Sequence, residues 1–115
     1  MSAIQPKRPA VSPSWAFLTN HAHVLIVIAR DHKVRLRDIA SQVGITERAV
    51  QKIIAELEAS GVLTKSKEGR RNSYFVNDAV ALRHPLEAHR TLGALVEMVL
   101  GRPFNRSGEL PEVGE

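Results

Sequence analysis

The chain has 115 residues, a formal net charge of +4 and no cysteine. Its length favours one domain, and the lack of cysteine excludes disulfide frameworks, thiolate metal sites and a thiol redox sensor within it. The positive charge is concentrated in residues 30–76, where ten basic side chains stand against six acidic ones. A polyanion is therefore a candidate partner, although a solvated surface explains the charge equally well.

Both ends of the chain have the composition of tails. Residues 1–14 hold three prolines, three serines and the pair Lys7 and Arg8, and residues 101–115 hold three glycines, two prolines and three glutamates. Segments of this kind bury too little apolar surface to become ordered. We expect a flexible basic tail at 1–14, a flexible tail at 101–115 and a folded region between them.

The first element expected is a helix over residues 19–30. Thr19 or Asn20 can cap its first turn, and the apolar run 24–29 implies burial on more than one side. A buried strand is the competing interpretation because the run is rich in β-branched residues, but the total length favours the helix. The run is too short for a bilayer, which takes roughly 18–20 apolar residues, and no secretory signal precedes it, so we expect a cytoplasmic protein without a membrane partner. Residues 34–36 can form a very short strand.

Two helices joined by a tight turn are expected next, over residues 36–43 and 46–60. Gly44 suits the left-handed conformation that ends a helix, and Thr46 is a favourable N-cap residue. Ala40 supplies the small side chain that two steeply crossing helices need where they touch. This spacing predicts a helix-turn-helix.

The second of these helices separates apolar from polar side chains. At 3.6 residues per turn, one side carries Val50, Ile53, Ile54 and Leu57, and the other carries Arg48, Gln51, Lys52 and Ala55. In the major groove, arginine can pair with guanine and glutamine with adenine, so the polar side is a candidate DNA-reading surface. An ordinary amphipathic helix with a solvated face is the alternative.

Residues 62–67 and 72–76 are predicted to form a hairpin around a turn that contains Gly69. Its basic side chains are Lys65, Lys67, Arg70 and Arg71. They suit contacts with phosphates or with the minor groove. Protection of an edge strand against aggregation is the alternative for the two lysines, and it explains paired arginines at a turn less well.

The last element expected is a helix from near Pro85, because proline is favoured at the first helical position, to Leu100, which a glycine and a proline follow. Its apolar stripe is too broad for one shallow contact. With two aromatic residues that precede the first helix, it predicts a dimer interface made of Trp15, Phe17, Leu86, Leu92, Leu95, Val96, Val99 and Leu100. Packing of this stripe wholly within one chain is the alternative.

Residues 36–76 resemble the winged helix-turn-helix domain of MarR/ArsR-like bacterial transcription regulators. The resemblance lies in three motifs, LRDIASQVGITERAVQ at 36–51, LEASGVL at 57–63 and GRRNSY at 69–74. It implies a homodimer that binds a near-palindromic operator in double-stranded DNA. Carried over by position, it places at the DNA Thr46, Arg48, Gln51, Lys52, Arg70 and Arg71. The chain is short for a MarR-type protein and lacks the cysteines of thiol-based ArsR metal sensors, so a small-molecule effector is left unknown.

Metal and catalytic sites have weak support. His21 and His23 are two residues apart and fall on different faces of a helix, and His84, Glu87 and His89 form a loose group, whereas zinc or nickel needs three or four converging ligands. A partner chain could complete such a set, so a ligand role for the last three stays open. The sequence shows no nucleophile–base pair, phosphate loop or paired carboxylates, and we expect neither an enzyme nor a cofactor.

Together these observations predict a mainly α fold with a small β-hairpin (α+β). A winged helix-turn-helix DNA-binding domain is expected at 15–78 and an additional C-terminal dimerisation helix at 83–100. The expected function is a dimeric, sequence-specific transcriptional regulator, acting as a repressor, with the recognition helix in the major groove and the basic wing on the backbone or minor groove. Because a fold does not fix a function, a protein-interaction module and a non-specific nucleic-acid-binding protein remain the alternatives.

Overall fold

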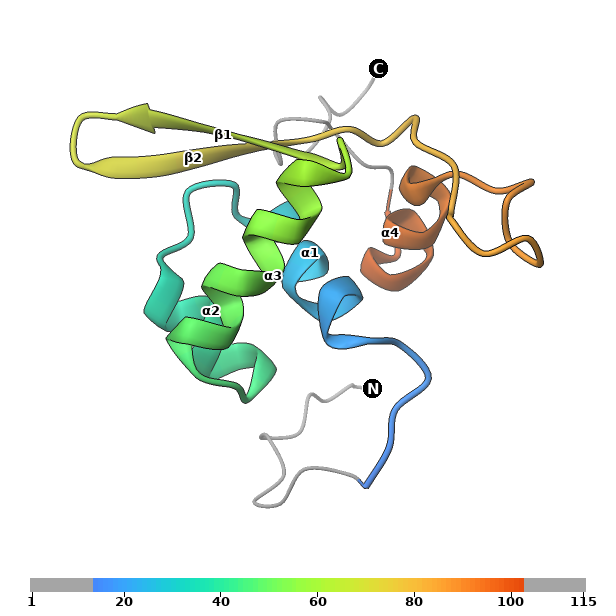
Figure 1. Cartoon of the computed structure of the whole chain (residues 1–115), viewed down its shortest axis with the longest axis horizontal. Coiled ribbons are helices and arrows are strands. Elements are labelled where there is room, and N and C mark those ends of the chain that lie inside the picture. The colour runs from blue at the N-terminus through green and yellow to red at the C-terminus, as the bar shows by residue number, and fades with distance from the viewer. Residues whose placement is uncertain (1–13, 103–115) are drawn as a thin grey trace.

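The computed structural model describes residues 14–102. In chain order they form α1 (Asn20–Arg30), α2 (Leu36–Val43), α3 (Glu47–Ala59), β1 (Leu63–Glu68), β2 (Arg71–Val76) and α4 (Leu92–Leu100). Figure 1 shows α1, α2 and α3 packed together, with the hairpin projecting on one side and α4 lying on the other. The predicted mainly α fold with one hairpin is confirmed. The tails predicted at 1–14 and 101–115 lie almost entirely outside the described residues.

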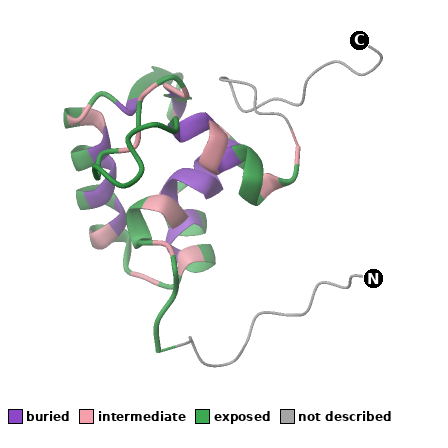
Figure 2. Cartoon of the chain, turned by 90° about the vertical axis from the view of Figure 1, so that its right-hand side faces the viewer, coloured by how far each residue is buried: buried purple, intermediate pink, exposed green. Residues whose placement is uncertain are grey.

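Helix α1 forms the centre of the core. From Val24 to Ala29 no side chain is more than 8% exposed, because the helix packs against α2, α3 and α4. Figure 2 shows the buried residues gathered in the interior, between the exposed outer faces of the helices. The hydroxyl of Thr19 caps the helix by accepting the N–H of Ala22 at 3.2 Å. The helix is confirmed over the competing strand, and none of the helices described is long and apolar enough to cross a membrane.

The turn between α2 and α3 is built as the sequence predicts. Gly44 has φ +88°, a left-handed conformation that costs glycine little, and its N–H donates to the carbonyl of Ala40 at 2.8 Å. Ala40 itself is buried. Oγ1 of Thr46 accepts the N–H of Ala49 at 3.0 Å and so caps α3. The helix-turn-helix is confirmed.

The hairpin is buried at its root, and its first strand is exposed beyond it. Leu63 lies opposite Val76 at its root, and both side chains are buried, whereas β1 is exposed from Thr64 to its end. Gly69, with φ +67°, begins the two-residue turn. The two strands predicted from the sequence are confirmed, with ends displaced by one residue.

The short strand expected at 34–36 is wrong. Val34 is buried and α2 begins at Leu36, so this part of the described chain holds no strand. The nearby carbonyl of His32 accepts one hydrogen bond, at 2.9 Å, from the N–H of Tyr74. This is a single backbone–backbone hydrogen bond between the α1–α2 loop and β2, and one such bond does not make a strand ladder.

The predicted start of the last helix is also wrong. Helix α4 begins at Leu92, where the hydroxyl of Thr91 caps it, and not near Pro85. The stretch between is a loop that returns on itself, because the N–H of Leu82 donates to the carbonyl of Arg90 at 2.9 Å. This hydrogen bond closes the loop with Pro85 in a turn. The preference of proline for the first position of a helix therefore has no effect there.

Candidate nucleic-acid interface

Helix α3 offers a polar face directed away from the core. It packs against α1, α2 and β1 through a buried inner face made of Val50, Ile53, Ile54 and Leu57. Its exposed outer face carries Arg48, Gln51, Lys52 and Ala55. The predicted separation of the two faces is confirmed. A helix about 10–12 Å across fits a B-DNA major groove about 12 Å wide, so this face has the shape and the donors for base reading.

The polar groups on this face are available to a ligand. Within residues 14–102, no hydrogen bond or ion pair occupies the side chains of Arg48, Gln51 or Lys52. Thr46 is exposed at the start of the same helix; its oxygen is used as the cap, and its hydroxyl hydrogen is left to donate. Side chains without a hydrogen bond or ion pair inside the protein can contact DNA without first breaking one.

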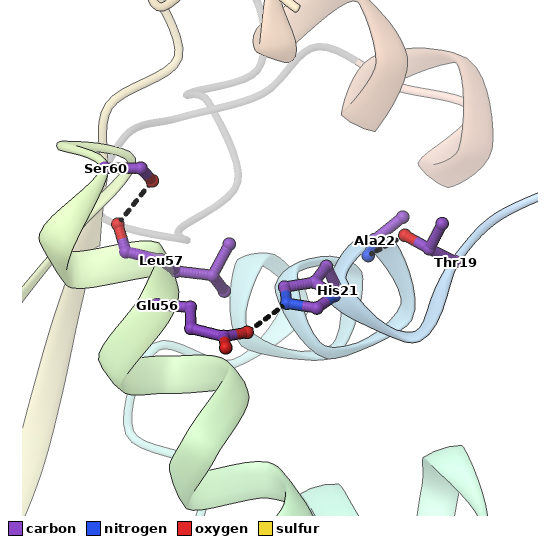
Figure 3. Close-up of polar contacts among 6 residues, drawn as sticks. All are labelled: Thr19, His21, Ala22, Glu56, Leu57 and Ser60. Atoms are coloured by element: carbon purple, nitrogen blue, oxygen red, sulfur yellow. Dashed lines mark hydrogen bonds and ion pairs between the residues drawn. The ribbon is translucent and has the colours of Figure 1, made fainter. Parts of the chain in front are cut away.

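A contact that the sequence did not predict joins α1 to α3. Nε2 of His21 donates to Oε1 of Glu56 at 2.6 Å, as Figure 3 shows. A carboxylate can only accept, so Nε2 carries the hydrogen. This hydrogen bond lowers the pKa of Glu56 from its ordinary value; desolvation opposes it and the charge of Lys52 supports it. Because 35 positions separate the two residues, no local sequence signal could have revealed the pair.

All four basic side chains predicted for the wing are exposed: Lys65, Lys67, Arg70 and Arg71. In the strand register, Lys65 lies opposite Tyr74 and Lys67 opposite Asn72. Since side chains alternate between the faces of a strand, the two lysines project from the same face of the hairpin. In Figure 1 the hairpin projects to the left, above α2.

Arg71 has a protein partner. Its Nη2 donates to the carbonyl oxygen of Lys33, in the α1–α2 loop, at 3.0 Å. The ammonium of Lys33 in turn lies 3.2 Å from Oε1 of Glu68, at the end of β1. These contacts connect the wing to the loop, so a contact between Arg71 and DNA stays a proposal.

The residues predicted for the dimer interface divide into two groups. Leu92 and Val96 are buried in the chain's own core, 7% and 0% exposed, because α4 packs against α1. For these two the prediction is wrong and the alternative of packing within one chain holds. Leu95 and Leu100 are partly buried.

The other predicted interface residues remain on the surface: Trp15, Phe17, Leu86 and Val99 are exposed. The rings of Trp15 and Phe17 meet edge to face, with their centroids 4.8 Å apart. Phe17, which is 91% exposed, lines an apolar hollow of about 830 Å³ between the start of α1, the end of α3 and α4. Apolar surface is therefore concentrated on the α4 side of the molecule.

The histidine groups do not converge. Nδ1 of His84 accepts the N–H of Leu86 at 3.0 Å, and His23 pairs with Asn20 in its own helix at 3.1 Å. In the part of the chain that the structure describes, no three histidine, aspartate or glutamate side chains meet as a metal ion requires. The structure thus gives no support to a role for the group around His84.

Three solved structures resemble part of this chain. A single-residue variant of Lactococcus lactis ZitR has 18% identity and a TM-score of 0.46 over 61% of this chain and 49% of that one. The regulator PcaV from Streptomyces coelicolor, solved with its natural ligand, has 21% identity and a TM-score of 0.48 over 72% and 60%. The zinc-bound MarR-family regulator AdcR has 24% identity and a TM-score of 0.42 over 58% and 47%. The chain therefore spans between 47% and 60% of the length of these proteins.

Comparison with curated proteins finds no match. A family model described as a winged helix DNA-binding domain matches residues 17–77, which is more than half of the chain. The matched range contains α1, the helix-turn-helix and the hairpin, and it confirms the winged-helix resemblance inferred from residues 36–76. The chain belongs to the family of winged helix DNA-binding domains.

Proposed function

We propose that this protein is a sequence-specific transcriptional regulator that inserts α3 into the major groove of DNA. The observation that carries the proposal is the exposed face of α3, where the side chains of Arg48, Gln51 and Lys52 make no hydrogen bond or ion pair in the described part of the chain. Arginine offers two parallel donors to guanine, and glutamine offers a donor and an acceptor to adenine. The wing lysines and Arg70 then contact the backbone or the minor groove.

The proposed active form is a homodimer on a near-palindromic operator. The exposed apolar residues Trp15, Phe17 and Val99 support a partner on the α4 side, away from the wing (Figure 1). A two-fold protein would place its two α3 helices about 34 Å apart, one turn of DNA. Repression is the simplest outcome, because a dimer that covers a promoter blocks access without any further contact.

Selection from a pool of random duplexes tests this function. We expect the full chain to enrich a near-palindromic sequence, and Arg48→Ala to lose discrimination at one base pair of each half-site, by about 1–3 kcal/mol. Arg90→Ala, which removes an exposed cation from the loop before α4, is the matched control and should enrich the same sequence. Equal recovery of all sequences would favour a non-specific nucleic-acid-binding protein, and no recovery of DNA would favour a protein-interaction module.

A further inference from the structure

A basic hollow of about 350 Å³ lies between the wing and the loop that joins α1 to α2. Lys33 and Arg35 line it from the loop side, and Arg70 and Arg71 line it from the wing. All four cations are exposed, and no carboxylate is among the described residues that form its wall. Positive charge is thus concentrated where two segments distant in the sequence meet.

Three contacts hold the two sides of the basic hollow together. Nη2 of Arg71 donates to the carbonyl of Lys33 at 3.0 Å, and the N–H of Tyr74 donates to the carbonyl of His32 at 2.9 Å. The ammonium of Lys33 lies 3.2 Å from Oε1 of Glu68. These contacts involve both strands of the hairpin, so the wing cannot swing away from the loop without breaking them. The fold itself therefore builds the hollow.

Nearby carboxylates neutralise only part of this charge. Glu68 pairs with Lys33, and Oδ1 of Asp31 accepts the backbone N–H of Lys33 at 3.1 Å within its own loop. Among residues 14–102, neither Arg35 nor Arg70 has a hydrogen bond or ion pair from its side chain. Like charges held near one another repel, and an anion placed between them removes that repulsion.

We propose that the basic hollow binds a phosphate group of the DNA backbone, an inference that rests on the proposed function. Arg35 and Arg70 have planar guanidinium groups, which can each give two parallel hydrogen bonds to phosphate oxygens. Arg35 directly precedes α2, the first helix of the helix-turn-helix, and Arg70 lies at the wing tip. A phosphate held between them fixes the duplex relative to both the recognition helix and the wing, and carries no sequence information itself.

Duplex DNA suits the basic hollow better than a free small anion. The lining cations are exposed, so water and salt weaken their attraction to a single small anion. A duplex adds the release of its condensed counterions for every phosphate that the protein neutralises. It is also positioned by α3 and the wing at the same time, which an isolated anion is not.

Removal of the charge of Arg35 tests the proposal. The affinity for one duplex of fixed sequence is measured by fluorescence anisotropy between about 50 and 200 mM salt, for the full chain and for Arg35→Ala, Arg35→Lys and Arg90→Ala. Loss of one phosphate contact reduces the slope of log K against log salt by about 0.9. We expect that reduction for Arg35→Ala, and none for Arg35→Lys, which keeps the charge. The control Arg90→Ala, in the loop that Figure 1 shows opposite the hairpin, should also leave the slope unchanged.

An unchanged slope for Arg35→Ala, or an equal reduction for Arg90→Ala, would overturn the inference. Sequence preference is measured in parallel, with the selected duplex and a scrambled one. A reduced slope in a protein without sequence preference would support the basic hollow and reject the specific regulator. An unchanged slope with the preference intact would reject the basic hollow and leave the proposed function standing.

A second measurement distinguishes the backbone phosphate from a free anion. Amide shifts of residues 33–36 and 70–72 are followed by NMR while either duplex or inorganic phosphate is added at equal phosphate concentration. We expect the shifts to saturate with the duplex and not with inorganic phosphate. Saturation by inorganic phosphate in the same range would show a small-anion site and would count against the proposal.

Discussion

Arg70 and Arg71 are adjacent in the chain, yet their side chains have different surroundings. In the described structure Arg70 is exposed and holds no ion pair, whereas Arg71 donates to the carbonyl of Lys33. Arginine and lysine carry the same charge, but the guanidinium adds a planar fork of donors that the ammonium lacks. Substitution of an arginine by lysine therefore keeps the charge and removes the hydrogen bond that the guanidinium makes. Through its hydrogen bond to Lys33, Arg71 is a positioning residue for the wing.

We expect Arg71→Lys to loosen the wing while preserving its charge. The amide of Tyr74, which donates to the loop beside this contact, should exchange its hydrogen about 2–10 times faster, as expected when a hydrogen bond worth about 0.5–1.5 kcal/mol is lost. Arg70→Lys is the matched control, because that side chain has no partner to lose within the described residues, and it should leave the exchange rate of Tyr74 unchanged. Equal rates in the wild type and Arg71→Lys would show that the contact does not position the wing.

The contact between His21 and Glu56 predicts a dependence of stability on acid. The pKa of Glu56 is lowered from 4.5 in the folded chain, so its ionised form favours folding. This contribution is complete above pH 4.5 and is lost as the pH falls through the lower, folded-state pKa. The difference in unfolding free energy between the wild type and Glu56→Gln should shrink as the pH falls below 4.5.

A double-mutant cycle with His21→Ala isolates the interaction. Chemical unfolding at several pH values gives the coupling between the two residues, which should disappear in acid as Glu56 takes up its proton. The coupling is expected to be small, because both side chains are about half exposed and water screens such pairs. A coupling that persisted below the folded-state pKa would contradict the assignment.

At the level of the elements, local signals determined which predictions were correct. Gly44 and Thr46 each determine the backbone within one helical turn of their own position. The sequence therefore predicted the bounds of α2 and the start of α3 to within one residue. Pro85 gave an equally local signal for the start of the last helix, and the prediction based on it was wrong. The segment around Pro85 is instead a loop, closed by the hydrogen bond from the N–H of Leu82 to the carbonyl of Arg90. Such a closure depends on the tertiary fold.

Gly44→Ala tests whether the backbone conformation of this turn limits stability. A Cβ at this position would meet no atom within 4 Å, so crowding is not the cause of any effect. The left-handed backbone, with φ +88°, costs a non-glycine residue about 1–2 kcal/mol, and we expect a loss of stability of that size in urea unfolding. Gly44→Asn should lose less, since asparagine tolerates this conformation better. Equal losses for both substitutions would point to another cause.

At the scale of the whole molecule, two side-chain contacts join distant parts of the chain. The bond from Arg71 to Lys33 spans 38 positions, and the pair of His21 and Glu56 spans 35. Periodicity and capping identify a helix or a strand, but they do not say which side chains of two elements will meet. The sequence therefore predicted which residues are polar and exposed, while the position of the wing and the burial of Leu92 became evident only in three dimensions.

The side of the molecule that carries α4 exposes apolar side chains. Phe17 is 91% exposed, and Met98 and Val99 on α4 are exposed as well. A monomer seldom leaves large apolar side chains together on its surface without a use for them. A two-fold assembly through this side would direct both wings away from the interface, as two half-sites on one face of a duplex require.

We expect the double substitution Phe17→Glu with Val99→Glu to give a folded monomer. Both side chains are exposed, so the unfolding midpoint should change little, whereas carboxylates placed in an apolar interface lose their hydration without a partner. Sedimentation velocity should show a dimer for the wild type and a monomer for the variant. Affinity for the selected operator should fall by roughly 10² or more, because the two half-sites no longer act together. Phe75→Glu, which changes an exposed aromatic residue of the wing, is the control for assembly and should remain dimeric; a variant at residues 17 and 99 that still sediments as a dimer would place the interface elsewhere.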